Sequence, residues 1–300
     1  MIFRAKAPLR LGLAGGGTDV YPYSDLYGGA VLNATISMYA YATVELKEDG
    51  MIILEEIDKG QEIKEEIKDK IEIDGRSNLL KGVYNRVVKD FIKNPLSFKL
   101  TTYVDAPPGS GLGSSSTLIV SVVGAFCEWL KLPLGEYDIA QLAYKIERED
   151  LGIAGGKQDQ YAATFGGFNF MEFYNNDKVI VNPLRIKQEC INELEFNLLL
   201  YYTGKSRLSS RIVEVEQKSM IENNQRTIEA MHRLKEQAIL MKEIILKGKL
   251  GGIGELLEYG WQYKKQITEG ISNPLIDEIY EVAKKAGATG GKISGAGGGG

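Results

Sequence analysis

The sequence predicts a two-domain protein that contains both helices and strands. The chain has 300 residues, about twice the length of an ordinary domain. Segments rich in β-branched and aromatic residues alternate with segments of helical periodicity. Glycine makes up 35 of the 300 residues, well above the roughly 7% of average proteins. The glycines gather in short clusters between patterned segments, so we expect loops of special backbone shape rather than a low-complexity chain.

Composition and charge exclude several classes of protein. Lys and Arg number 36 against 40 Asp and Glu, a net charge of −4, which argues against nucleic acid or an anionic membrane as the main partner. No apolar run approaches the roughly 20 residues that cross a bilayer, and the start of the chain lacks signal-peptide features. Two cysteines are too few for a disulfide framework or a zinc cluster. We therefore expect a cytoplasmic protein.

The first half alternates strands and helices. Residues 3–13 and 30–46 have the composition of strands, and the charged alternation over 51–73 predicts short edge strands facing solvent. A helix is expected over 79–91, where apolar residues recur at helical spacing, and a strand over 97–104.

Two helices and a strand pair complete this half. The segment 117–130 is almost wholly apolar, which predicts a buried helix, and 134–150 is amphipathic. Strands are expected over 168–173 and 179–182. We place the first domain at residues 1–185.

The second domain is expected to span residues 186–300. It opens with a very apolar segment, 196–202, that predicts a strand, and a long amphipathic helix follows over 209–246. The remaining predicted elements are helices over 253–267 and 274–286 and a short strand over 291–293. The chain stops inside a glycine loop that would normally lead into another strand, so we expect this domain to be truncated there.

A glycine- and serine-rich loop lies directly before the buried helix at 117–130. Glycines at three alternate positions let backbone N–H groups turn inward, and the serines fall at a helix N-terminus, where orphan N–H groups and the helix dipole favour an anion. The loop therefore predicts a phosphate cradle, with a plain capped turn as the alternative; it fits neither a Walker A loop nor a Rossmann fingerprint. Its residues are Pro108, Gly109, Ser110, Gly111, Leu112, Gly113, Ser114, Ser115 and Ser116.

Two carboxylates downstream could serve such a site. Glu147 ends an amphipathic helix and can point inward, and Asp159 follows a glycine turn that can fix its direction. One carboxylate and a serine hydroxyl suffice as protein ligands for Mg²⁺, and the second carboxylate could accept a substrate hydroxyl proton. For the neighbouring Glu149 and Asp150 we prefer a solvated helix end.

The N-terminal strand runs into a second glycine turn. Arg10 lies among apolar strand residues, where an unpaired guanidinium would be costly, so a carboxylate or phosphate partner is expected. Asp19 follows the turn and could grip sugar hydroxyls with both oxygens. A structural ion pair at Arg10 and an Asx turn at Asp19 are equal alternatives.

Three motifs together resemble the GHMP family of small-molecule kinases. They are Ala7-Pro8-Leu9-Arg10 leading to Gly17-Thr18-Asp19, the loop from Pro107 to Ser116, and Lys292-Ile293-Ser294-Gly295-Ala296-Gly297-Gly298-Gly299. They occur in the family's order and span nearly the whole chain. The resemblance implies an α+β fold of two domains, one like ribosomal protein S5 domain 2 and one ferredoxin-like, with ATP bound between them.

The resemblance also implies roles for individual residues. Ser115 and Glu147 match the family's Mg²⁺ ligands, and the loop 108–116 would wrap the triphosphate, so ATP and Mg²⁺ are the expected cofactors. Asp159 matches the aspartate near the phosphoryl acceptor. Arg10 matches the basic residue that pairs with that aspartate and steadies the transferring phosphoryl group.

Three segments bear on the subgroup within the family: Leu13-Ala14-Gly15-Gly16-Gly17-Thr18-Asp19, Tyr27 to Ile36, and Tyr202 to Arg207. They most resemble the heptose 7-phosphate kinase subgroup. Thr18 and Asp19 match the sugar-binding residues, and a sugar phosphate would need an anion site of its own. Lys205, Arg207 and Arg211 are the candidates, with solvated helix-start charges as the alternative. The implied reaction is ATP-dependent phosphorylation of an anomeric hydroxyl, on the route to nucleotide-activated heptose for surface polysaccharide. A homodimer is one option for its assembly.

Three other functions stay open. A neutral-sugar 1-kinase, like fucokinase or galactokinase, would keep the same fold without a phosphate site. An ATP-dependent decarboxylase of the mevalonate branch is disfavoured by the sugar-type pair Thr18 and Asp19. A non-catalytic sensor of ATP and sugar is disfavoured because the four expected catalytic and metal-binding residues are all intact.

Overall fold

One mixed sheet organises the first half of the molecule. The structure, a computed structural model, describes residues 1–92, 94–204 and 209–300. Within these residues seven strands form a sheet in the order β4-β3-β5-β2-β6-β7, with β1 paired to β2. The strands are β1 (Ile2–Ala14), β2 (Gly29–Leu46), β3 (Met51–Glu56), β4 (Gln61–Glu66), β5 (Phe98–Val104), β6 (Phe168–Phe173) and β7 (Val179–Pro183). The β3–β5 pair is parallel and the others are antiparallel.

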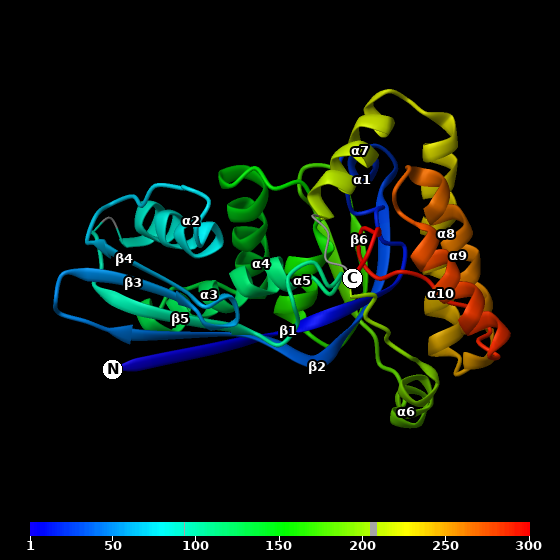
Figure 1. The fold of residues 1–300 in the computed structure, drawn as a ribbon, viewed down its shortest axis with the longest axis horizontal. Coiled ribbons are helices and arrows are strands. Elements are labelled where there is room, and N and C mark those ends of the chain that lie inside the picture. Colours follow the sequence, from blue (N-terminus) through cyan, green and yellow to red (C-terminus); the bar gives the residue numbers. More distant parts are fainter. Residues whose placement is uncertain (93, 205–208) are drawn as a thin grey trace.

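The long strand β2 connects both ends of this sheet (Figure 1). One of its edges pairs with β1, from Ile2 opposite Glu45 to Ala14 opposite Leu32. Its other edge pairs with β6 near its start and with β5 near its end. The strands predicted in the first half are confirmed, and the charged segment 51–73 contributes the edge strand β4.

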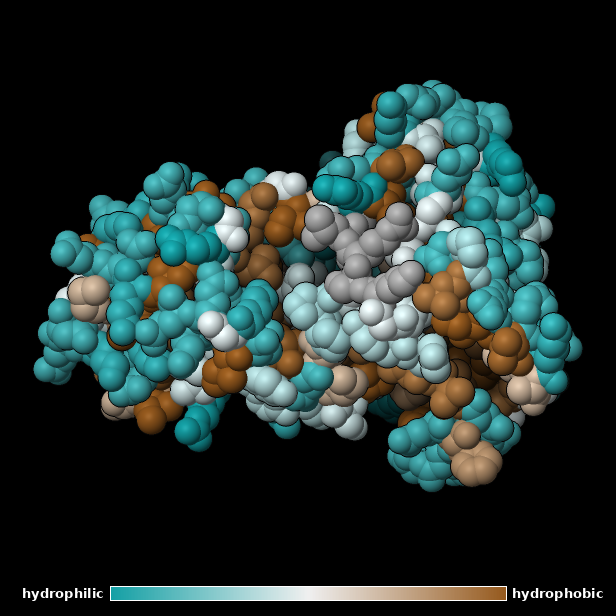
Figure 2. Space-filling view, in the orientation of Figure 1, coloured by the Kyte–Doolittle hydropathy of each residue, from teal (hydrophilic) through white to brown (hydrophobic). Residues whose placement is uncertain are grey.

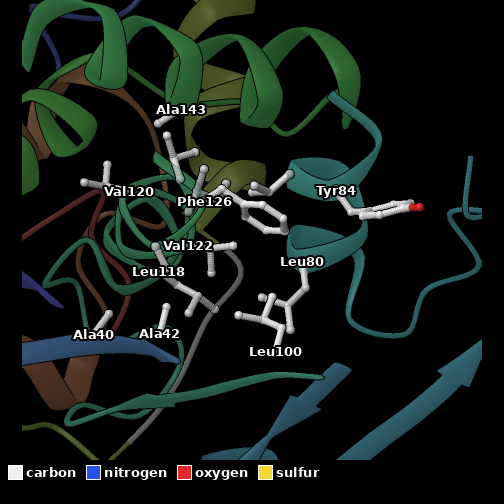
Figure 3. Packing of buried hydrophobic residues seen from close by; sticks show 14 of the residues in the cluster. Ala40, Ala42, Leu80, Tyr84, Leu100, Leu118, Val120, Val122, Phe126 and Ala143 are labelled. Atoms are coloured by element: carbon white, nitrogen blue, oxygen red, sulfur yellow. The ribbon is translucent and has the colours of Figure 1, made fainter. Parts of the chain in front are cut away.

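Helices of the first half pack on the sheet and enclose its core. They are α2 (Asn78–Val87), α3 (Ser114–Leu130), α4 (Glu136–Lys145) and α5 (Gln158–Phe165). Figure 3 shows Val122 and Phe126 of α3 near Leu80 of α2 and Leu100 of β5, and all four side chains are fully buried. Neighbours on several sides of α3 explain why its sequence is apolar all round, as a buried helix requires.

Helices α6 to α10 form most of the second half. They are α6 (Gln188–Asn197), α7 (Ser209–Ile221), α8 (Gln225–Leu246), α9 (Ile253–Ile267) and α10 (Pro274–Lys285). Helices α8 and α9 lie side by side, and α8 packs on β1 and β2 (Figure 1). Leu32 of β2 and Ala238 and Met241 of α8 belong to one buried cluster. The two halves therefore share an apolar core where they meet.

The single helix predicted over 209–246 is two helices in the structure. Asn223 has a left-handed backbone, with φ of 54°, which a helix interior cannot contain. Asn224 then caps α8, because its side-chain oxygen accepts hydrogen bonds from the N–H groups of Arg226 and Thr227. The prediction was wrong because the apolar stripe continues across this turn.

The strands predicted over 196–202 and 291–293 are not formed in the structure. Helix α6 ends at Asn197, and residues 198–204 follow without a helix or strand. An apolar run favours a strand, but a strand exists only through hydrogen bonds to a neighbour. A local pairing is present nearby, since the N–H of Thr203 donates to the carbonyl of Gly300 at 2.8 Å.

The surface is polar over much of the first half. Figure 2 shows hydrophilic residues over the β3–β4 end and apolar surface between α6 and α10. Among the exposed apolar side chains, Phe196 and Leu199 are 90% and 88% exposed. None of the described helices combines the length and apolarity needed to cross a membrane.

Candidate active site

Arg10 and Asp159 form an ion pair where the glycine-rich segments meet. The register between β1 and β2 shifts between Pro8 and Arg10, and such irregularities re-aim a side chain. The Nη2 atom of Arg10 lies 2.6 Å from Oδ1 of Asp159, and Nε donates to the same oxygen at 2.7 Å. The Arg10 side chain is buried, whereas that of Asp159 keeps 21% exposure. The carboxylate is thus reachable from solvent while the guanidinium balances its charge.

Asp19 caps the helix that carries Asp159. Helix α5 begins at Gln158, whose N–H donates to Oδ2 of Asp19 at 3.0 Å, and Oδ1 of Asp19 accepts from the N–H of Gly17 at 3.2 Å. Negative charge at a helix N-terminus is favoured by the helix dipole. A side chain at Gly156 would collide with this carboxylate. Asp19, predicted as a sugar ligand, therefore also fixes the first turn of α5.

Thr18 ties the glycine turn to β2. Its hydroxyl lies 2.8 Å from the carbonyl of Gly15 and 3.0 Å from that of Ala30, and it accepts from the N–H of Ala30 at 3.0 Å. The residue is fully buried. Thr18 was predicted to bind substrate; in the structure its hydroxyl is occupied by backbone partners. A short helix, α1 (Tyr23–Tyr27), follows the turn.

The loop over 108–116 has the backbone that its glycines suggest. The alternate glycines at 109, 111 and 113 have φ of 76°, 75° and 78°, in the left-handed region that favours glycine. The carbonyl of Gly111 accepts from Nη1 of Arg10 at 2.5 Å and from the hydroxyl of Ser294 at 3.1 Å. The hydroxyl of Ser110 is buried, and no described residue hydrogen-bonds it. The loop therefore packs against the motifs that contain Arg10 and Ser294, and the Ser110 hydroxyl is available to a ligand.

Glu147 lies buried beside the first turn of α3. Its Oε2 accepts from the hydroxyl of Ser116 at 2.6 Å and from Nε2 of Gln160 at 2.7 Å. Ser115 is exposed on the same turn, so Ser116, rather than Ser115, is the serine in contact with Glu147. A carboxylate and hydroxyls at a helix N-terminus suit a hard divalent cation. The described residues contain no cluster of three His, Cys, Asp or Glu side chains that could hold a metal by themselves.

Two lysines of the second half enter the same region, and sequence analysis did not assign either to the site. Nζ of Lys292 donates to the carbonyl of Gly12 at 2.5 Å. Burial, together with the positive charges of Lys264 and Arg10, lowers the pKa of Lys292 to about 7. Nζ of Lys264 donates to the carbonyl of Gly16 at 3.1 Å. Lys292 belongs to the third motif, so the sequence could have indicated that this lysine lies in the site. Lys264 lies in an ordinary amphipathic helix, and nothing in the local sequence indicated it.

Glu216 of α7 lies against Lys264. The two charged groups are 3.6 Å apart, and Glu216 is 1% exposed. Burial raises the pKa of Glu216, the charge of Lys264 opposes that shift, and Asp19 adds to it. Oε1 of Glu216 has no hydrogen-bond partner among the described residues. Nothing in the local sequence distinguished this glutamate from the other charges of its helix.

The predicted site for the substrate's phosphate is only partly covered by the structure. Lys205 and Arg207 lie outside the described residues. Arg211 is exposed on the first turn of α7.

A glycine loop at a helix start can bind phosphate, and a nearby carboxylate can accept a hydroxyl proton, so this arrangement suits phosphoryl transfer. Family models agree with it: the GHMP kinases N terminal domain matches residues 78–167, and the GHMP kinases C terminal domain matches residues 240–300. The chain belongs to the GHMP kinase family, and its predicted fold is confirmed.

Known proteins of this family are similar to the chain over nearly its full length. The chain is 54% identical over 297 residues to D-glycero-alpha-D-manno-heptose 7-phosphate kinase of Campylobacter jejuni, covering 99% of this chain and 87% of that protein. It resembles a crystal structure of a D-glycero-D-manno-heptose 1-phosphate kinase from Bacteroides thetaiotaomicron with a TM-score of 0.84 at 50% identity, covering 99% and 86% of the two chains. Lactococcus lactis galactokinase, complexed with galactose, shares the fold at 22% identity, with a TM-score of 0.73 over 100% of this chain and 84% of that one.

Proposed function

We propose that this chain transfers the γ-phosphoryl group of ATP to the anomeric hydroxyl of a sugar phosphate. The observation that carries the proposal is the Arg10–Asp159 pair, which contacts the glycine loop through Gly111. Asp19 caps α5, the helix that carries Asp159. A phosphate cradle and a candidate sugar-binding turn thus flank one proton acceptor. That is the arrangement that in-line phosphoryl transfer requires.

In this mechanism Asp159 accepts the proton of the attacking sugar hydroxyl. The oxygen of that hydroxyl bonds to the γ-phosphorus of ATP, while the bond from the γ-phosphorus to ADP breaks and ADP leaves. Arg10 neutralises negative charge on the transferring phosphoryl group, and its hydrogen bond to the loop keeps it beside the phosphates. Positioning and charge neutralisation supply most of the acceleration, so no covalent enzyme intermediate is needed.

The loop 108–116 would hold the triphosphate through backbone N–H groups at the start of α3. Its left-handed glycines and the unpartnered hydroxyl of Ser110 support this role. Glu147 and Ser115 would hold Mg²⁺, with Ser116 and Gln160 orienting the carboxylate. When bound, Mg²⁺ supplies charge neutralisation for the phosphates of ATP.

The sugar that we propose is D-glycero-D-manno-heptose 7-phosphate, converted to the 1,7-bisphosphate for nucleotide-activated heptose in the cytoplasm. The relative from C. jejuni supports it by name, whereas the name of the B. thetaiotaomicron relative places the existing phosphate at the 1-position. Asp19 would bind sugar hydroxyls, with Thr18 fixing the turn around it. Lys205, Arg207 and Arg211 would bind the 7-phosphate.

The test is ADP release with Mg-ATP and a panel of acceptors: heptose 7-phosphate, heptose 1-phosphate, fucose and galactose. We expect turnover with heptose 7-phosphate and a new anomeric signal in the ³¹P NMR spectrum of the product. Turnover only with heptose 1-phosphate would show that the substrate already carries its phosphate at the 1-position and that another hydroxyl is the acceptor. Turnover only with a neutral sugar would overturn the phosphate site, and a chain that binds ATP without turnover would overturn the kinase mechanism.

A further inference from the structure

Two charged residues of the second half bracket the glycine turn that leads to Asp19. Nζ of Lys264, on α9, donates to the carbonyl of Gly16, and Glu216, on α7, lies 3.6 Å from that lysine. A Cβ atom at Gly17 would lie 2.7 Å from Oε1 of Glu216 and 3.0 Å from Nζ of Lys264. Both side chains thus lie beside the backbone of the turn, and no room is left there for a side chain at residue 17.

Lys264 offsets negative charge that is buried beside this turn. Glu216 and Lys264 are 1% and 6% exposed, and Asp19 is 2% exposed. Burial raises the pKa of Glu216, the charge of Lys264 lowers it, and the negative charge of Asp19 raises it further. The charge of Lys264 therefore opposes the repulsion that Asp19 exerts on Glu216. Without Lys264, that repulsion would be felt in a medium of low effective dielectric constant.

We propose that Lys264 and Glu216 are positioning residues for the sugar substrate: they set the shape of the turn over residues 15–19 and so the direction of the Asp19 carboxylate. The inference rests on the proposed function, in which Asp19 binds sugar hydroxyls. Helices α7 and α9 would thus contribute to binding of the sugar without touching it, because their charged residues fix the backbone of the turn over residues 15–19.

This arrangement predicts unequal effects on the two substrates. The loop that would hold ATP is fixed by Arg10 and Ser294, which contact neither Glu216 nor Lys264 in the described structure. A distorted turn should therefore weaken sugar binding and leave ATP binding nearly unchanged. A merely structural role would lower the amount of folded enzyme and affect neither KM.

The experiment measures KM for sugar and for ATP in Lys264→Met, Glu216→Gln, the double variant and Lys264→Arg. We expect Lys264→Met to raise the sugar KM roughly tenfold or more, because it leaves the buried carboxylate of Glu216 without its cation and subject to repulsion from Asp19. The double variant should recover much of that loss, since Glu216→Gln removes one of the two charges. Lys264→Arg, which keeps the charge, should lie near the wild type.

The matched control is the pair Lys284 and Glu258, which joins α10 to α9 at the surface at 2.7 Å. Lys284→Met should leave both KM values unchanged. The inference is wrong if Lys264→Met raises the two KM values alike, or if the double variant is no better than Lys264→Met.

A second readout does not depend on turnover. Hydrogen exchange should be faster in Lys264→Met at the amides of Gly17 and Thr18, whose hydrogen bonds hold the turn, and unchanged in α3. If the wild type phosphorylates no sugar, the proposed function fails and this readout still decides the positioning role. Unchanged exchange over residues 15–19 would overturn the inference even in an active enzyme.

Discussion

Arg10 links the N-terminal strand to the glycine loop and to Asp159 through its side chain and its backbone. Its N–H donates to the carbonyl of Leu112, its Nη1 donates to that of Gly111, and its guanidinium pairs with Asp159. A buried guanidinium without such partners would cost several kcal/mol. At the scale of residues, therefore, the site is held by a buried guanidinium and its partners, and removing one partner affects the others.

The carboxylate of Asp159 is the proposed proton acceptor. Asp159→Asn keeps the shape of the side chain but removes its basicity, so we expect kcat to fall by about 10²- to 10⁴-fold while ATP binding stays near the wild-type level. Steady-state kinetics and ATP titration measure both. Asp150→Asn, at an exposed carboxylate paired with Arg86, is the control and should keep full activity. A near-full kcat in Asp159→Asn would remove this residue from the mechanism.

Lys292 should give a pH-dependent contribution to stability. Its pKa is about 7 in the folded protein against its usual 10.5, so the unfolded chain binds more protons between these two values. Its contribution to folding therefore becomes more favourable as pH rises from 7 toward 10. Urea unfolding of the wild type and Lys292→Met at pH 6, 7.5 and 9 tests this. The free energy of unfolding of the wild type should rise relative to that of the variant; parallel pH profiles would contradict the lowered pKa.

At the scale of elements, helix α3 serves both the core and the site. Its middle is buried, with the ring of Phe126 edge-on to that of Phe98 at 5.4 Å between centroids. Its first turn carries three serines in different surroundings, with Ser115 exposed and Ser116 bound to Glu147. The packed body of the helix thus gives its N-terminus a fixed position beside the glycine loop.

The two serines should respond differently to substitution. We expect Ser115→Ala to raise the Mg²⁺ concentration needed for half-maximal activity, because the proposed ligand is lost. Ser116→Ala removes a hydrogen bond to a buried carboxylate, so it should also lower the free energy of unfolding by about 1–3 kcal/mol. Magnesium titration and urea unfolding of both variants separate the roles. An unchanged magnesium titration in Ser115→Ala, with a shift in Ser116→Ala, would transfer the ligand role to Ser116.

At the scale of the whole molecule, the two halves are joined by apolar contact as well as by the site. The buried cluster that contains Leu32 of β2 and Met241 of α8 crosses the expected domain boundary near residue 185. Each half also supplies charged groups to the glycine turn. Separate unfolding of either half would expose this shared surface.

We therefore expect the halves to unfold together. Each contains one tryptophan, Trp129 on α3 and Trp261 on α9. In Trp129→Phe and Trp261→Phe, fluorescence reports on one half at a time, while circular dichroism reports on the whole chain. The urea transitions seen by the two methods should coincide within each variant. Clearly separated midpoints would show that the shared cluster does not couple the halves.

Much of the architecture could be predicted because it depends on neighbouring residues. Alternation and apolar content predicted the strands of the first half and the buried helix at 117–130. The glycines of the loop predicted its left-handed backbone. The helix break at Asn223 was not predicted, because the apolar stripe continues across the turn. The strands predicted over 196–202 and 291–293 were wrong, because a strand also needs a neighbouring strand to pair with.

The sequence by itself determined the family, the glycine loops and the candidates Arg10, Glu147 and Asp159, since these occur in short motifs with recognisable chemistry. The family resemblance implied that Arg10 pairs with Asp159, 149 residues away, and the tertiary structure gave this pair its geometry. Only the tertiary structure placed Lys264 beside Gly16, 248 residues away. Only the structure assigned Ser116 to Glu147 and revealed Glu216 beside the turn. The physical reason is that the pairing and burial of a charge depend on residues distant in the chain, which no local pattern records.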